Sequence, residues 1–417
     1  MSSPPENADE NADEETQNRE IPTHIISTEI LSETQNRGIP TDVILTEILP
    51  RLPANSLLRL KWVCKEWQLF ISSTKFIINH ALHPNSLSSR SVLFIDPYTS
   101  LTAFDFGDSG NVRIIKFGRY STTNPIFLIG SCNGLVLLIC SHAQTGLVLS
   151  PSFLLNYGFD YRVYNPVLQL DIVIPQPLGF VLRSDHFAAQ DCSFGFGSVS
   201  THDCLEFFIV AVNIRMGNVA VFESSTRRWV IMHTLRRNLP ILFQDAWYVH
   251  SGTLVNEALH WGVTVGMNLR CIAVFDLVSR RRIKFMKLPY AYFGEPDCPD
   301  IVRSAFSLCR INDRLCAWAY YNGGYVVDMW MLKEYDVWES WTRLFCYDLR
   351  CEYWNFFGLT KAREVMMFHF NWLVLIDFSR VPLVSRPLYF GHQVTAVNYV
   401  QSLVSPYTVF LYGEQNG

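Results

Sequence analysis

The chain has 417 residues, of which 49% are hydrophobic and 14% aromatic, and its formal net charge is −4. This composition excludes a mainly disordered chain, and the length favours two or more domains or one large repeat domain. The charge argues against nucleic acid as a partner, because nucleic-acid binding needs a concentrated basic face. No stretch approaches the ~18 apolar residues that a membrane span requires, so no membrane partner is expected.

Residues 1–38 predict a disordered acidic tail. ENADENADEE at 6–15 carries six acids and cannot bury enough apolar surface to offset its ordering entropy. A longer stretch then occurs twice, as ETQNREIPTHIISTEIL at 15–31 and as ETQNRGIPTDVILTEIL at 33–49, with 13 of 17 positions identical. We interpret the first copy as a duplicated fragment without function; a weak decoy helix is the alternative.

From Ile39 the pattern becomes helical. Thr41 is expected to cap a first helix, which Pro50 and Pro53 end. A second helix, capped at Asn55 or Ser56, is predicted over residues 57–60, and a third from residue 63 to residue 71. Three such short helices form a unit too small to be stable alone. Some of their apolar side chains should therefore meet another surface.

After about residue 90, strand patterns dominate and one unit recurs. An apolar strand ends at an aromatic or aliphatic residue, and a polar turn and a second strand follow. The unit ends its first strand at Phe104, Tyr164, Phe222, Phe275, Leu332 and Ile376, in steps of 60, 58, 53, 57 and 44 residues.

A second unit, a turn followed by an apolar strand, precedes several of these. It is seen in GSCNGLVLL at 130–138, GTLVNEALHWGV at 252–263 and RINDRLCAWAY at 310–320. Hairpins that recur every ~40–50 residues are typical of propeller blades. We therefore predict an α+β multidomain chain: a small three-helix domain, then a mainly β domain, a β-propeller of about six blades. A β-sandwich is the alternative, but it does not explain the recurrence.

Residues 39–82 resemble the F-box of plant F-box proteins. The resemblance rests on Ile39-Pro40, Glu47-Ile48-Leu49, Arg51-Leu52-Pro53, Ser56-Leu57-Leu58-Arg59, Val63-Cys64-Lys65, Trp67, and Phe76 before His80. Residues 90–415 resemble the F-box-associated, kelch-like region of the same proteins. That second resemblance rests on SCNGLVLL, VYNPVLQ, FGFG, VAVFESSTRRWVI, GTLVNEALHWGV, IAVFDLVSRRRIKFMKLP, WMLKEYDVWESWTRLF and SLVSP, in this order.

The resemblance implies a substrate receptor of a Skp–cullin–F-box ubiquitin ligase. The F-box would bind a Skp-type adaptor and, through it, cullin, while the β domain would hold a protein substrate for ubiquitination. The apolar residues expected to bind the adaptor are Pro40, Ile44, Ile48, Leu49, Leu52, Leu57, Leu58, Val63, Cys64 and Trp67. Val63 and Trp67 could instead hold the helices together. A scaffold that does not promote degradation fits the sequence equally well.

Two loops are candidates for substrate contact, because loops vary on a rigid scaffold. One is residues 141–160. The other is PYAYFGEPDCPD, whose mix of aromatic and acidic groups suits a protein or peptide partner. The residues singled out there are Tyr290, Tyr292, Phe293, Glu295 and Asp297.

Motifs for catalysis, cofactors and metals are missing. The histidines lack metal-binding spacing, and the 11 cysteines form no Cys-x-x-Cys pair. FGFG at 194–197 is interpreted as a turn or bulge, and SRRRIK at 279–284 as a solvated turn. We expect a non-enzymatic protein without cofactor, in the nucleus or cytoplasm. The alternative is a propeller enzyme or a sugar- or small-molecule-binding protein with an incidental F-box.

Overall fold

The chain divides into two units, Met1–Ile48 and Leu49–Gly417. The predicted tail of residues 1–38, with the first sequence copy at 15–31, lies outside the described residues. The computed structural model describes residues 39–83, 91–95, 101–106, 112–116, 126–142, 159–178, 192–201, 204–213, 218–233, 241–243, 251–265, 269–280, 283–289, 305–321, 326–348, 354–361, 364–369, 372–377, 384–390 and 395–410.

The first unit is described from Ile39 on, and this described part is helical. The α-helical turn α2 (Thr41–Val43) continues into η1 (Ile44–Ile48), which is π-helical. The predicted cap at Thr41 is wrong, since Pro40 is the N-cap and makes no side-chain hydrogen bond. Its carbonyl accepts from the amide of Ile44 at 3.1 Å, so the backbone alone begins this helix.

The second unit begins with helices whose starts differ from the prediction. α3 begins after the N-cap Pro53, because the Pro53 carbonyl accepts from Leu57 N, and Asn55 and Ser56 already lie inside the helix. A further helix, capped by Ser73, follows the predicted three. Among its described residues, the helical segments are η2 (Leu49–Arg51), α3 (Ala54–Leu60), α4 (Lys65–Ser72), α5 (Thr74–Leu82), η3 (Trp338–Ser340) and α9 (Pro406–Phe410).

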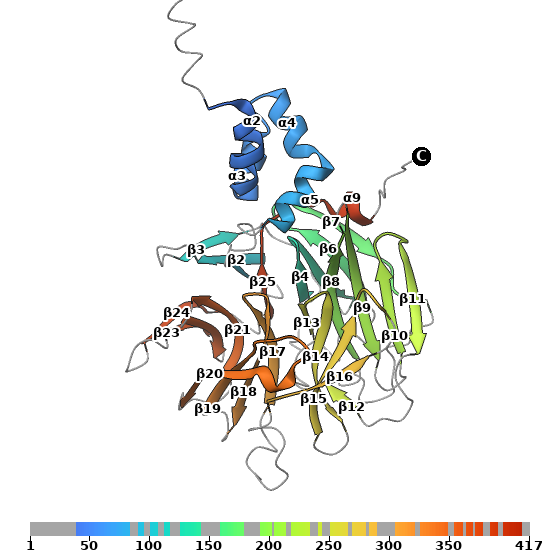
Figure 1. The fold of residues 1–417 in the computed structure, drawn as a ribbon, viewed down its shortest axis with the longest axis vertical. Coiled ribbons are helices and arrows are strands. Elements are labelled where there is room, and N and C mark those ends of the chain that lie inside the picture. Colours follow the sequence, from blue (N-terminus) through green and yellow to red (C-terminus); the bar gives the residue numbers. More distant parts are fainter. Residues whose placement is uncertain are drawn as a thin grey trace, which may run out of the picture. The chain divides into compact units, whose positions relative to one another are not determined.

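The described strands of the second unit form antiparallel meanders of four strands (Figure 1). The first contains β1 (Ser91–Ile95), β2 (Leu101–Phe106) and β3 (Val112–Lys116), and is completed by β25 (Thr395–Tyr399) from the far end of the chain. The second is β4 (Ile126–Cys132), β5 (Leu135–Ser141), β6 (Phe159–Asn165) and β7 (Leu170–Ile174).

The next two meanders share one nine-stranded sheet, joined by a parallel pairing of β8 with β13. One is β8 (Cys192–Ser200), β9 (Leu205–Asn213), β10 (Asn218–Glu223) and β11 (Arg228–His233). The other is β13 (Ser251–Val255), β14 (Ala258–Val265), β15 (Leu269–Asp276) and β16 (Lys284–Lys287), with β12 (Ile241–Phe243) beside β14.

Two separate four-stranded sheets follow. They are β17 (Ala305–Ile311), β18 (Arg314–Tyr321), β19 (Val326–Leu332) and β20 (Trp341–Asp348), then β21 (Trp354–Lys361), β22 (Glu364–His369), β23 (Trp372–Asp377) and β24 (Val384–Phe390). A β-sandwich has two packed sheets, whereas the described strands form five, so that alternative is wrong. The prediction of small helices followed by a mainly β region is confirmed.

The recurring sequence units coincide with fixed places in these meanders. The first recurring sequence unit ends its apolar strand at six residues, from Phe104 to Ile376. These residues lie on β2, β6, β10, β15, β19 and β23, each the third strand of its meander. The second recurring sequence unit, a turn followed by an apolar strand, forms the hairpin between the first and second strands in β4–β5, β13–β14 and β17–β18. Each recurrence therefore corresponds to one four-stranded meander.

The first strands of successive meanders contact one another in turn. β25 contacts β4, β4 contacts β8, β8 pairs with β13, β13 contacts β17, β17 contacts β21, and β21 contacts β25. β25, from the end of the β region, therefore pairs with β1 in one sheet and also contacts β4 and β21.

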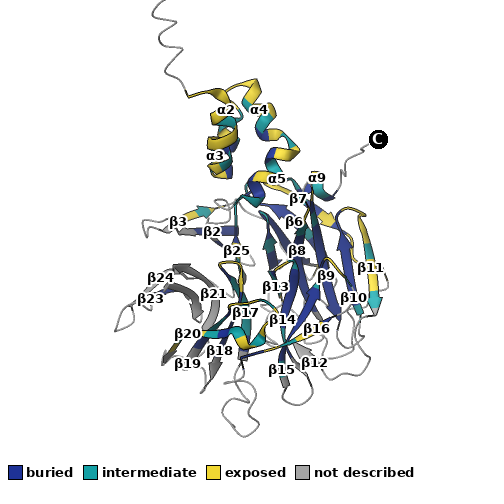
Figure 2. Ribbon diagram, viewed as in Figure 1, coloured by how far each residue is buried: buried dark blue, intermediate teal, exposed yellow. Residues whose placement is uncertain are grey.

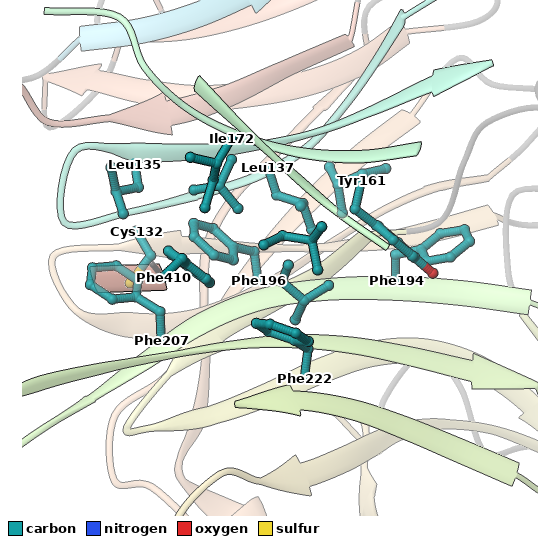
Figure 3. Close-up of a cluster of buried hydrophobic side chains, with 14 of the residues drawn as sticks. Cys132, Leu135, Leu137, Tyr161, Ile172, Phe194, Phe196, Phe207, Phe222 and Phe410 are labelled. Carbon is teal, nitrogen blue, oxygen red and sulfur yellow. The ribbon is translucent and has the colours of Figure 1, made fainter. Parts of the chain in front are cut away.

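The largest core cluster lies between β4–β7 and β8–β11 (Figure 3). Phe194 and Phe196 on β8, Phe207 on β9 and Phe222 on β10 belong to this cluster, and Phe410 joins them from α9. Figure 2 shows β9 and β10 as buried along most of their length. Apolar side chains on both faces of these strands explain why they read as nearly continuous apolar runs.

FGFG lies inside β8, so its interpretation as a turn or bulge is wrong. Its glycines permit close packing instead. A Cβ at Gly195 would lie 2.6 Å from Leu259 Cδ1, and one at Gly197 would lie 2.8 Å from Leu277 Cδ1. Within the described residues, helices of the length and apolarity that a membrane crossing requires are absent.

Candidate functional site

The ten residues predicted to bind an adaptor differ in their exposure. Leu49 and Leu57 are 1% and 0% exposed, so their side chains are covered within the chain itself. The other eight are accessible to different extents: Pro40, Ile48, Val63 and Cys64 are exposed, and Ile44, Leu52, Leu58 and Trp67 are half-buried.

The turn between α3 and α4 presents two apolar side chains to solvent. Trp62 is 86% exposed and Val63 is 62% exposed. Their amides donate to the carbonyls of Arg59 and Leu60, each at 3.1 Å, so the backbone of this turn is held in place. A large exposed aromatic side chain next to an exposed aliphatic one is a feature of partner-binding surfaces.

Leu69 adds a third exposed apolar side chain, on α4, at 74% exposure. Sequence reasoning missed both Trp62 and Leu69. The signal for Leu69 was available: Trp67, Phe70 and Ile71 form the covered stripe of α4, and Leu69 lies off that stripe. An apolar residue outside the stripe has no covering within its own helix bundle.

Cys64 has a structural role that its exposure does not reveal. It is the N-cap of α4, in an extended conformation, and its sulfur accepts from the amide of Trp67 at 3.4 Å. The predicted helix start at Val63 is therefore wrong, because the extended backbone of Cys64 interrupts the helix. Substitutions at Cys64 would alter the cap as well as any partner contact.

His80, on α5, connects that helix to Leu52, near the start of the second unit. Its Nε2 lies 2.8 Å from the carbonyl oxygen of Leu52, which fixes Nε2 as the donor. The buried Nδ1 then carries no hydrogen and has no hydrogen-bond partner. The ring of Phe76 stacks on the imidazole, with the two ring centroids 5.9 Å apart. Burial lowers the pKa of His80 below its usual value. At neutral pH the folded state therefore holds a neutral imidazole here.

α5 also contacts the β region. Its residue Ala81 belongs to the core cluster of Figure 3, and Ile77 and Leu82 pack against that cluster. Phe410 and Val404, from the C-terminal segment, lie in the same cluster. α5 of the F-box-like segment and α9 thus share one core.

The predicted substrate-binding residues Tyr290, Tyr292, Phe293, Glu295 and Asp297 lie outside the described residues, as does most of the loop 141–160. Among the residues that the structure describes, groups of three or more potential metal ligands are absent. The imidazole of His260 is fully buried and is hydrogen-bonded to Tyr335 and to the backbone of Thr253.

Relatives of the chain are found among plant F-box proteins. It is 24% identical to the F-box protein CPR1 of Arabidopsis thaliana, over 71% of this chain and 70% of that protein. It is 25% identical to an A. thaliana F-box/kelch-repeat protein, over 70% and 75% of the two chains. A further A. thaliana F-box protein is 24% identical over 70% and 68%. No family model matches the chain.

Solved structures are similar only at a distance. The Aleuria aurantia lectin has a TM-score of 0.39 and 9% identity, over 73% of this chain and 93% of the lectin. Trypanosoma rangeli sialidase has a TM-score of 0.34 and 9% identity, over 72% and 50%. These likenesses are too remote to bear on function. The sequence similarities, together with the residues of 39–82, identify the chain as a relative of the plant F-box proteins, F-box/kelch-repeat proteins among them.

Proposed function

We propose that the chain is a substrate receptor of a Skp–cullin–F-box ubiquitin ligase, acting in the nucleus or cytoplasm. In this proposal the helices of residues 39–82 bind a Skp-type adaptor, and the β region holds a protein substrate. The relationship to F-box proteins supports the first part. The transfer chemistry would belong to other subunits, so the chain itself would be non-catalytic.

The observation that carries the proposal is the exposed apolar surface of Trp62 and Val63, with Leu69 on the following helix. A stable protein interface buries about 1,600 Å² in total, and a few central apolar anchors supply most of its energy. The buried Leu49 and Leu57 would then support the surface from within instead of touching the partner.

For the β region we propose a propeller of six blades, one for each four-stranded meander. Two observations support it: the first strands contact one another in a closed series, and β25 completes the sheet of β1, β2 and β3. Closure of the first blade by a strand from the chain's end would protect its edges. Such a scaffold would present its connecting loops to a substrate.

The adaptor part is tested by measuring the affinity of the full chain for a purified Skp-type adaptor. Val63→Asp places a charge on the exposed turn without opening a cavity, so we expect adaptor affinity to fall at least about tenfold while the fold is kept. Val278→Asp is the matched control, because Val278 is 60% exposed in the turn between β15 and β16. It should bind like the unaltered chain.

Two outcomes would count against the proposal. If the intact chain fails to bind any Skp-type adaptor, the assignment as a ligase subunit is wrong. If Val63→Asp and Val278→Asp bind equally well, the exposed turn is not the adaptor surface. Circular dichroism spectra of both variants establish that the comparison is made between folded proteins.

A further inference from the structure

Two free cysteines lie directly opposite each other on neighbouring strands. Cys309 is on β17 and Cys316 on β18, and they are register partners in the antiparallel ladder. Cys140, by contrast, lies opposite Ile126 and Asp160, so a buried cysteine of this chain need not have a cysteine partner.

The hairpin turn fixes the separation of the pair. Asn312 and Asp313 both have positive φ, 48° and 61°, as a two-residue hairpin turn of the primed type requires. Ile311 and Arg314 close that turn as a hydrogen-bonded pair, and hydrogen-bonded pairs alternate along the ladder. Cys309 and Cys316 are the next such pair, with Cα atoms about 5.5 Å apart. Disulfides span Cα separations of about 4.4–6.8 Å.

The environment of the pair determines its resting state. Cys316 is fully buried, while Cys309 is half-buried. Burial, followed by the neighbouring Cys316 thiol, raises the pKa of Cys309 well above its usual value. The Cys309 thiol is therefore protonated at neutral pH, and its reaction with an oxidant is slow unless the pH rises.

We propose that Cys309 and Cys316 are a reversible oxidation site that closes into a disulfide across β17 and β18 in response to peroxide. The Cys309 sulfur, as thiolate, attacks one oxygen of hydrogen peroxide; the O–O bond breaks, water leaves and a sulfenic acid forms. The Cys316 sulfur then attacks the Cys309 sulfur, the S–O bond breaks, and a second water carries away the remaining proton. Two thiols lose two electrons, and one peroxide is reduced to two waters.

The position of the bond gives it a structural consequence. The residues on either side of Cys309 hold the neighbouring meanders: the carbonyl of Leu308 accepts from Thr253 Oγ1 on β13, and that of Arg310 accepts from Asn398 Nδ2 on β25, each at 3.2 Å. A disulfide at Cys309 acts on the backbone between these two contacts. Oxidation is therefore expected to affect the contacts of β17 with β13 and with β25.

Peptide mapping of the native full chain tests the proposal. The protein is treated with hydrogen peroxide, free thiols are blocked, and the protein is digested with trypsin. Cleavage after Arg310 and Arg314 leaves the two cysteines in separate peptides, 304–310 and 315–333. We expect these peptides to be found linked, to separate on reduction, and to form faster at pH 9 than at pH 7.

Two variants make the result specific. Cys316→Ser should abolish the linked peptide, and Cys140→Ser, at a buried cysteine without a cysteine opposite, should leave it unchanged. The proposal is overturned if Cys309 and Cys316 are recovered as blocked free thiols while the exposed Cys64, Cys204 and Cys346 become oxidised. It is also overturned if Cys309 is found linked to any other cysteine.

Discussion

His260 Nε2 and the hydroxyl oxygen of Tyr335 lie 2.7 Å apart, inside the β region. On the other side of the ring, Nδ1 lies 3.1 Å from the carbonyl oxygen of Thr253, which can only accept. Nδ1 therefore carries the hydrogen, and Nε2 accepts from Tyr335. The imidazole is fully buried, and this burial is the main cause that lowers the pKa of His260 to about 4.

Stability should fall in mild acid because of this histidine. Between pH 6.5 and 4 the unfolded chain binds a proton at residue 260 that the folded chain excludes, so the free energy of unfolding decreases as the pH falls. At pH 5 the loss relative to pH 7 is about 2 kcal/mol. Urea unfolding of His260→Gln should show a pH dependence weaker by that amount than that of the unaltered chain. Equal pH dependence in the two proteins would contradict this account.

Arg280 should stabilise the fold more than expected for a residue of the basic cluster SRRRIK, which the sequence alone predicts to be a solvated turn. Its guanidinium binds Glu223 and Glu206, the latter at 3.2 Å, and so links β9 and β10 to the turn after β15. Arg280→Met leaves Glu223, which is 8% exposed, without its cation, and we expect a loss of about 2 kcal/mol after allowance for partial solvent access. Arg310→Met breaks the more exposed pair with Asp313 and should cost under about 1 kcal/mol. Chemical denaturation of both variants gives the comparison; similar losses would refute the distinction.

Sequence reasoning located the repeating β units because local turn chemistry and strand pattern determine them. Asn-Gly at 133–134 and Asn-Asp at 312–313 form the hairpin turns that their residue types favour. It failed where distant contacts decide the outcome. The ion pairs of Arg280 join residues 57 and 74 positions apart, and the SRRRIK cluster alone indicates only a solvated turn.

The helix starts were misplaced for a different reason. Proline and cysteine precede α2, α3 and α4, and none of these residues is a preferred cap, so backbone geometry outweighed capping propensity. Which of the ten predicted adaptor residues are buried, half-buried or exposed could be learned only from the fold, since helical spacing does not tell which side of a small helix meets its own chain. Their role in adaptor binding stays a prediction.

Gly134 should tolerate no side chain. Its φ is +80°, and a Cβ there would lie 2.1 Å from Ser402 Cβ and 2.8 Å from Ser402 N. Gly134→Ala thus combines left-handed strain with a clash against backbone, and we expect it to cost more than about 2 kcal/mol. Gly130→Ala is the milder comparison, since its Cβ would meet Phe196 Cβ at 3.3 Å. The unfolding temperature of Gly134→Ala should be well below that of Gly130→Ala. The reverse order would show that the segment around Ser402 moves easily to accommodate a side chain.

The helix α9 should be essential to the core that it shares with α5. Phe410 is 1% exposed, and its ring centroid lies 5.9 Å from that of Phe207 and 6.1 Å from that of Phe222. Truncation of such a ring removes buried area and leaves a cavity, so Phe410→Ala should cost about 3–5 kcal/mol. Tyr407→Ala, on the same helix but 38% exposed, should cost less than about 1 kcal/mol. Hydrogen exchange of the amides in α5 gives a local readout: Phe410→Ala should speed it, because Ala81 lies in the same cluster, and Tyr407→Ala should not. Unchanged exchange in both variants would mean that α5 does not depend on the C-terminal helix.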